Sequence, residues 1–208
     1  MRQNVWTVLG LAVALLATGC TGKYKKQVSE KDARIAELEG QVRSLEGKVA
    51  DEESRSEELS KELAQALSDY REREQVWLAQ KDGQSIVTVS DAVLFGSGNA
   101  DLSSTGTDIV DRIAKVALQD RNRSILIEGH TDNVPIGANI KERFQSNWEL
   151  SSGRACSVAR YLYWKHKMDP KRLSAIGYGE HRPLTDNDTS KSRAKNRRVV
   201  IKIGPVEE

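Results

Sequence analysis

Cysteine is rare in this chain of 208 residues, which has only two, Cys20 and Cys156. Two cysteines cannot form a disulfide scaffold or supply a four-cysteine zinc site. Apolar runs of membrane-spanning length are also lacking. The uncharged run from Val5 to Gly19 reaches only about 22 Å of the roughly 30 Å hydrocarbon core. The sequence therefore excludes a disulfide mini-protein and a polytopic membrane protein.

An excess of charge of one sign is missing as well. The chain has 32 Lys and Arg against 30 Asp and Glu, a formal net charge of +2, so bulk electrostatics gives no reason to expect nucleic acid as a partner. The three histidines show no repeated metal-ligand spacing, and we expect neither a metal nor a cofactor. Hydrophobic residues at 38% and charged residues at 30% fit a soluble chain and exclude a fully disordered one.

The N-terminus has the pattern of an export signal. Arg2 precedes the apolar run, and the small residues Ala17–Gly19 stand directly before Cys20, as in secreted proteins. This resembles the bacterial lipobox, which implies a signal peptide at residues 1–19 and acylation, palmitate included, at Cys20. The next residue is Thr21 rather than Asp, which favours the outer membrane. The alternative is a signal peptide with an incidental cysteine.

A coiled coil is predicted between Lys23 and Gln80. This segment is charged, has no proline and repeats apolar residues at heptad spacing, the pattern of a coiled-coil seam. We expect an α-helical stalk over residues 20–82 that can form a homo-oligomer, with Arg34 facing Glu39 of a second copy. A lone helix folded back on the next domain is the alternative. The a and d positions include Val28, Ile35, Leu38, Val42, Leu45, Val49, Ser56, Leu59, Leu63, Tyr70 and Trp77.

From residue 83 onward, strand and helix patterns alternate. Strands are predicted at 85–95, 124–128, 172–177 and 199–203, and helices near 103–117, 149–165 and 190–196. The evidence is β-branched runs, serine caps and apolar stripes. Cys156 borders the stripe of the second helix, so we expect it in the core or at its boundary. The order predicts an α+β, βαβαβαβ two-layer sandwich with helices packed on one sheet.

Four segments carry a family resemblance: IEGHTDNVP, NWELSSGRACSVARYL, LSAIGYGEHRP and SKSRAKNRRVVIKI. In this order they are similar to the OmpA C-terminal-like domain, the module shared by OmpA, Pal and MotB. The resemblance covers about Ser85 to Ile203. It implies a non-catalytic fold that binds the stem peptide of peptidoglycan, usually through diaminopimelate.

The resemblance assigns the ligand pair of this family to Asp132 and Arg154. A diaminopimelate end presents an ammonium and a carboxylate on one carbon. Asp132 would accept hydrogen bonds from the ammonium, and the forked guanidinium of Arg154 would bind the carboxylate. Asn147, Thr131 and Arg197 resemble supporting ligands. The alternative is a structural salt bridge between Asp132 and Arg154 that ties a loop to a helix.

One departure concerns the segment between Asp132 and Asn147, which is longer than in OmpA or Pal and resembles MotB. A stator role like that of MotB is not expected, however, because the apolar run has no carboxylate for a proton-driven spanning helix.

The sequence thus predicts a lipid-anchored envelope protein, not an enzyme. Its parts are a signal peptide (1–19), an anchored stalk (20–82) and a peptidoglycan-binding domain (83–208). It would tether the outer membrane to the cell wall from the periplasmic side. The alternative is a wall-docked assembly or regulatory subunit whose coiled coil recruits a protein partner. A wall hydrolase is disfavoured because the motifs offer neither paired carboxylates nor a metal set.

Overall fold

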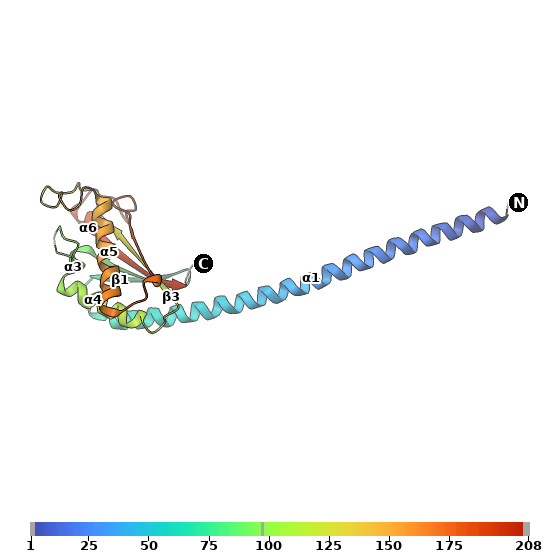
Figure 1. Ribbon diagram of the computed structural model, residues 1–208, viewed down its shortest axis with the longest axis horizontal. Coiled ribbons are helices and arrows are strands. Elements are labelled where there is room, and N and C mark those ends of the chain that lie inside the picture. Colours follow the sequence, from blue (N-terminus) through green and yellow to red (C-terminus); the bar gives the residue numbers. More distant parts are fainter. Residues whose placement is uncertain (1–2, 97, 206–208) are drawn as a thin grey trace. The chain divides into compact units, whose positions relative to one another are not determined.

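The computed structural model describes the backbone of residues 3–96 and 98–205, and their side chains except those of residues 3–21 and 23. The predicted signal peptide and lipid site at Cys20 therefore lie outside the described side chains. The chain divides into two units, one ending at Asp51 and one beginning at Glu52. The elements (Figure 1) are α1 (Gln3–Ala66), α2 (Ser68–Glu72), β1 (Val76–Lys81), β2 (Gln84–Ser90), α3 (Asp91–Leu94), α4 (Ser104–Ala117), β3 (Arg123–His130), α5 (Asn147–His166), η1 (Pro170–Arg172), β4 (Leu173–Gly177), α6 (Ser190–Asn196) and β5 (Arg198–Pro205).

The first unit consists of the N-terminal part of α1. Its large apolar side chains at heptad positions are between 43% and 67% exposed: Tyr24, Val28, Ile35, Leu38, Val42, Leu45 and Val49. The apolar stripe predicted from the sequence is therefore present on the helix and lies open to solvent. Among the described helices, none carries an apolar segment of the length needed to cross a bilayer.

The second unit is built on a five-stranded sheet with the strand order β1-β2-β5-β3-β4. Neighbouring strands are antiparallel except β3 and β4, which are parallel. Arg198 at the start of β5 pairs with Ser90 at the end of β2 and with His130 at the end of β3. Residues that directly follow β2 and β3, and those that directly precede β5, therefore meet at one end of the sheet.

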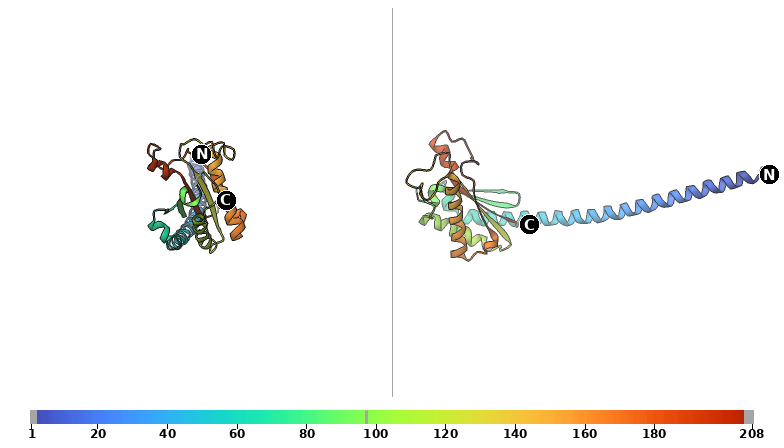
Figure 2. Two further views of the ribbon diagram at one scale, coloured as in Figure 1. Left: turned by 90° about the vertical axis from the view of Figure 1, so that its left-hand side faces the viewer. Right: turned by 45° about the horizontal axis from the view of Figure 1, so that its top comes forward.

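Helices cover one face of this sheet (Figure 2). The buried side chains alternate along the three central strands and include Val87, Val89, Ile125, Ile127, Val199, Ile201 and Ile203. Helices α4 and α5 and the last turns of α1 pack on them. Leu63 of α1 and Leu67, which directly follows this helix, are fully buried. Ser60 Oγ lies 2.7 Å from Ser85 Oγ on β2. The C-terminal turns of α1 are thus part of the hydrophobic core.

The predicted α+β class with a long N-terminal helix is confirmed. The predicted continuation of the helix to Gln80 is wrong, because α1 ends at Ala66 and Val76–Lys81 forms β1. Asp82 and Gly83 adopt positive φ angles of 51° and 70°, as required by the two-residue turns that join antiparallel strands. This turn pairs β1 with β2 and adds a strand that the heptad pattern concealed.

Two smaller predictions also differ from the structure. The strand expected over 85–95 ends at Ser90, and Asp91–Leu94 forms the short helix α3. Cys156 is a free, exposed cysteine rather than a core or boundary residue. The buried stripe of α5 runs through Ala155 and Val158, and each helical residue advances the direction by about a quarter turn. The side chain after Ala155 therefore points away from the core.

Candidate functional site

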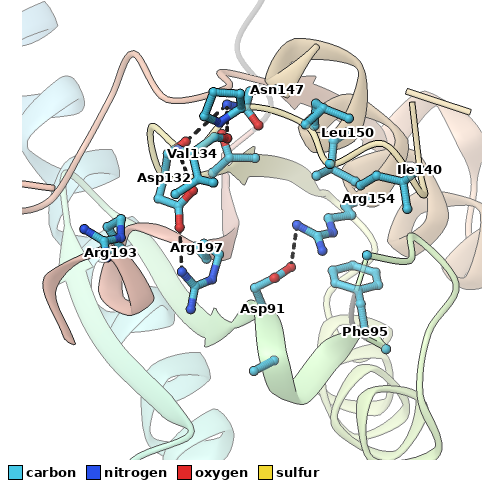
Figure 3. Close-up of a pocket in the computed structure, with 17 residues that line it drawn as sticks. Asp91, Phe95, Asp132, Val134, Ile140, Asn147, Leu150, Arg154, Arg193 and Arg197 are labelled. Carbon is cyan, nitrogen blue, oxygen red and sulfur yellow. Dashed lines mark hydrogen bonds and ion pairs between the residues drawn. The ribbon is translucent and has the colours of Figure 1, made fainter. Parts of the chain in front are cut away.

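A pocket of about 490 Å³ opens at the end of the sheet where β2, β3 and β5 meet. Figure 3 shows side chains from α3, from the loop between β3 and α5, from α5 and from the segment before β5 converging on it. Five charged residues line the pocket: Asp91, Asp132, Arg154, Arg193 and Arg197. They come from parts of the chain that only the sheet topology brings together.

Helix α5 reaches the pocket because two glycines let it lie close to the sheet. A Cβ on Gly129 would overlap the backbone oxygen of Ser151, and a Cβ on Gly177 would overlap the side chain of Ser152. Gly129 and Gly177 are paired across β3 and β4. Together they form a glycine seat, a patch of the sheet without side chains on which the helix packs. This close packing sets the depth at which Arg154 enters the pocket.

Asp132 follows β3 by two residues and is buried. Its Oδ2 forms an ion pair with Nη1 of Arg197 at 2.5 Å, and its Oδ1 accepts a hydrogen bond from the backbone N–H of Val134 at 3.0 Å. The second contact is a local turn that Asp favours, so the loop itself fixes the carboxylate. The side chain of Arg197 is 36% exposed, against 8% for Asp132. The cation of this pair is therefore its more accessible partner.

Arg154 and Asp91 form a second, more deeply buried ion pair. Arg154 Nη1 lies 2.9 Å from Asp91 Oδ1, and Arg154 Nε donates to the backbone oxygen of Asn99 at 3.1 Å. Burial raises the pKa of Asp91 against the opposing effect of Arg154, and burial lowers the pKa of Arg154. Within the described part of the chain, neither Nη1 nor Oδ1 has a partner in hydrogen-bond geometry. The two groups are therefore held together by charge rather than by a well-aligned hydrogen bond.

The two ion pairs act on each other. Arg197 and Asp132 both influence the pKa of Asp91 and that of Arg154, so the four groups form one electrostatic cluster. Two anions and two cations around one cavity can accept an ammonium and a carboxylate at the same time. Such an arrangement suits a compact zwitterion.

Asn147 and Thr131 support the loop after β3. The Nδ2 of Asn147 lies within hydrogen-bond distance of the backbone oxygens of Asp132 and Val134, at 3.3 and 3.1 Å, and of Glu180 Oε2 at 2.8 Å. The backbone N–H of Thr131 donates to the oxygen of Gly179 at 2.9 Å. The Thr131 hydroxyl is buried and has no hydrogen-bond partner among the described residues. Asn147 therefore braces the loop, whereas Thr131 offers a free hydroxyl.

The structure brings all five predicted binding residues to this pocket, namely Thr131, Asp132, Asn147, Arg154 and Arg197. It does not show the salt bridge between Asp132 and Arg154 that was the structural alternative, because each pairs with a different residue. The sequence analysis missed Asp91. The only signal in the sequence is its position as an acidic residue at the end of a strand in which apolar and polar residues alternate. In the described part of the chain, no cluster of His, Cys, Asp or Glu is arranged to hold a metal.

Comparison with known proteins places these features in a family context. A family model described as the OmpA family matches residues 94–197. Motility protein B of Bacillus subtilis is 39% identical over 120 residues, which is 58% of this chain and 45% of that protein. The chain spans about half the length of several curated relatives that it matches.

Solved structures share the fold at moderate identity. A MotB-like protein from Desulfovibrio vulgaris superposes with a TM-score of 0.69 at 27% identity, over 77% of this chain and 97% of the other. The cell wall anchor of the T6SS from Pseudomonas aeruginosa gives a TM-score of 0.63 at 32% identity, over 69% of this chain and 97% of the other. Neither of these structures, nor the relative above, is described as an enzyme.

Proposed function

Because the chain belongs to the OmpA family, we propose that its second unit binds peptidoglycan non-covalently, through the diaminopimelate of the stem peptide. The observation that carries this proposal is the pair of ion pairs, Asp91–Arg154 and Asp132–Arg197, facing one cavity. The likeness to a structure described as a cell wall anchor supports it. The role is one of attachment, without bond cleavage.

In the proposed complex the zwitterionic carbon of diaminopimelate sits between the two ion pairs. Asp132 accepts hydrogen bonds from the ammonium, which takes the place of Arg197 at Oδ2. Arg197 and Arg154 then bind the carboxylate, while the ion pair between Asp91 and Nη1 holds Arg154 in place. Thr131 contributes its free hydroxyl to the ammonium. Hydrogen bonds to charged groups are worth about 1.5–3 kcal/mol each, so a few of them support specific binding.

The anchor at the other end of the chain is proposed from the sequence. In this proposal residues 1–19 are removed, and acyl chains on Cys20 hold the protein in the outer membrane, because two or more chains give durable attachment. The part of α1 that follows Cys20 is the stalk, and it separates the anchor from the binding domain, whose compact unit begins at Glu52. The protein then faces the periplasm and tethers the outer membrane to the wall.

The exposed stripe of α1 supports self-association as part of this proposal. Val28, Val42 and Val49 are each at least 50% exposed, and apolar a and d positions favour pairing with a second helix. Arg34 pairs with Glu37 of its own helix at 2.7 Å on the surface, a weak contact. In a parallel pair Arg34 can instead reach Glu39 of the second copy.

The test is co-sedimentation of the full chain with purified peptidoglycan. Asp132→Asn keeps the shape of the side chain but removes the acceptor charge, and Arg154→Gln removes the carboxylate ligand. Arg160→Ala is the matched control, because this α5 arginine is 61% exposed and lies outside the pocket. We expect the wild type and the control to sediment with the wall and both pocket variants to stay in solution. Equal binding by all four would reject the pocket as the site.

The alternative function is a wall-docked assembly or regulatory subunit whose helix recruits another protein. The same exposed stripe of α1 favours it, because a stripe that can pair with a second copy can also pair with a different helix. Analytical ultracentrifugation of the full chain separates the two. A stable homodimer favours the tether, and a monomer leaves the stripe available to a different partner.

A further inference from the structure

The pocket has an apolar wall in addition to its charged residues. This wall is formed by Phe95, by Leu150 and by four residues of the loop after β3, namely Val134, Pro135, Ile136 and Ile140. Figure 3 shows Ile140, Leu150 and Phe95 near the Arg154 side chain, and Val134 beside Asp132. Phe95 and Leu150 are buried, whereas Val134 is 50% exposed and Ile140 is half-buried. The loop therefore presents apolar side chains at the pocket mouth, where they contact water unless a ligand covers them.

Contacts to the segment after α3 hold this wall in place. The Ile140 side chain lies against Gly98, where a Cβ would come within 3.1 Å of Ile140 Cγ2. Arg143 Nη1 donates to Asn99 Oδ1 at 3.1 Å, and the backbone oxygen of the same Asn99 accepts from Arg154 Nε. Asn99 thus connects the loop to the guanidinium. The apolar wall and Arg154 are positioned relative to each other by one short segment.

We infer that the apolar wall is a subsite for the aliphatic chain that leaves the zwitterionic carbon, so that the pocket selects its ligand by methylene number. The inference rests on the proposed function. A cavity of about 490 Å³ lies in the range that takes up a drug-sized ligand, so it has room for more than the ammonium and carboxylate. Methylene groups of the ligand that move from water onto this wall increase the affinity without adding charge.

The size of the effect follows from the burial of methylene groups. Each fully buried methylene is worth about 0.8 kcal/mol, which corresponds to roughly fourfold in the dissociation constant. Two ligands with identical zwitterionic ends and spacers of different length test this contribution. Diaminoglutarate has one methylene between its ends and diaminopimelate has three. Full burial of the two additional groups predicts that diaminopimelate binds about 15-fold more tightly.

The experiment is isothermal titration calorimetry of both ligands against the full chain and its variants. Ile140→Ser replaces an apolar wall residue by a small polar one, and Ile140→Val keeps it apolar. Leu184→Ser is the matched control, because Leu184 is 63% exposed and lies outside the pocket. We expect Ile140→Ser to bring the ratio of the two affinities toward one, mainly by weakening the binding of diaminopimelate. Ile140→Val and Leu184→Ser should retain the wild-type preference.

The outcomes separate this inference from the proposed function. Equal affinity of the wild type for both ligands, or a full preference retained in Ile140→Ser, overturns the apolar subsite. If the apolar subsite is overturned in this way but Asp132→Asn lowers the affinity for both ligands equally, the charged site of the proposed function is still supported. Absence of binding by either ligand overturns both. Should Ile140→Ser lower the melting temperature of the protein, Val134→Ser provides the same test from an exposed position.

Discussion

Removing the end of helix α1 together with α2 and β1 should unfold the binding domain. Five apolar side chains that precede residue 83 are buried in the core: Leu59, Leu63, Leu67, Tyr70 and Val76. At about 2 kcal/mol for each buried side chain, they contribute about 10 kcal/mol as an upper estimate. The total stability of a domain is about 5–15 kcal/mol. A fragment of residues 83–208 should therefore lack a stable fold, whereas a fragment of residues 52–208 should keep one.

Urea unfolding of the two fragments, followed by tryptophan fluorescence, measures the difference. A point variant gives a finer test in the full chain, since Leu63→Ala should lower the free energy of unfolding of the domain by about 2–5 kcal/mol. Leu45→Ala is the matched control on the same helix, because Leu45 is 58% exposed, and its effect should stay within about 0.5 kcal/mol. If residues 83–208 unfold at the same urea concentration as residues 52–208, the segment 52–82 is dispensable and the reasoning fails.

Four further predictions address the anchor, the helix and the charges. Cys20→Ser should release the chain from membranes in cell fractionation, and unchanged membrane association would contradict the lipid anchor. A peptide of residues 23–52 should sediment at twice its monomer mass, because its apolar stripe is exposed in the single chain; a monomer would contradict self-association. Asp91→Asn should lower the melting temperature, because it leaves the buried Arg154 without a counterion, and an unchanged value would show that Asp91 is not needed to neutralise it. Burial acts to raise the pKa of Glu128, but His130 and the ion pair with Lys202 outweigh it and the pKa is lowered. A carboxyl group whose pKa is lowered by folding stabilises the fold at pH values above its ordinary pKa. This stabilisation is lost as the pH falls through the pKa of the folded state. Glu128→Gln should therefore reduce the loss of melting temperature between pH 5 and pH 3, and an unchanged acid profile would contradict this.

Local signals allowed most elements of the second unit to be predicted. Ser103 accepts a hydrogen bond from the Gly106 backbone N–H and caps α4, which begins where its serine indicated. The hairpin of β1 and β2 was missed because Trp77 continues the heptad spacing of the preceding helix. The Asp82-Gly83 pair was the available signal, since this dipeptide favours the turn observed there. A long-range periodic pattern thus outweighed a two-residue turn signal.

The sequence allowed several residues of the site to be predicted, but not the ion pairs that they form. Asp132 and Arg154 were assigned from motifs that resemble those of the OmpA C-terminal-like domain, and both line the pocket. Their partners depend on the register of three strands, because Asp91 and Arg197 reach the pocket only through the pairing of Ser90 and His130 with Arg198. That register is set by the hydrophobic pattern of the whole sheet, which no single motif contains.

The glycine seat under α5 has a consequence for how this sequence can diverge. Gly129 and Gly177 meet backbone or side-chain atoms of α5 where any Cβ would stand, so even alanine would push the helix away from the sheet. Natural variation should therefore be absent at these two positions while the exposed face of α5 drifts freely. A saturation library selected for a correctly folded protein would show the same contrast. These two glycines would then be among the least replaceable residues of the domain.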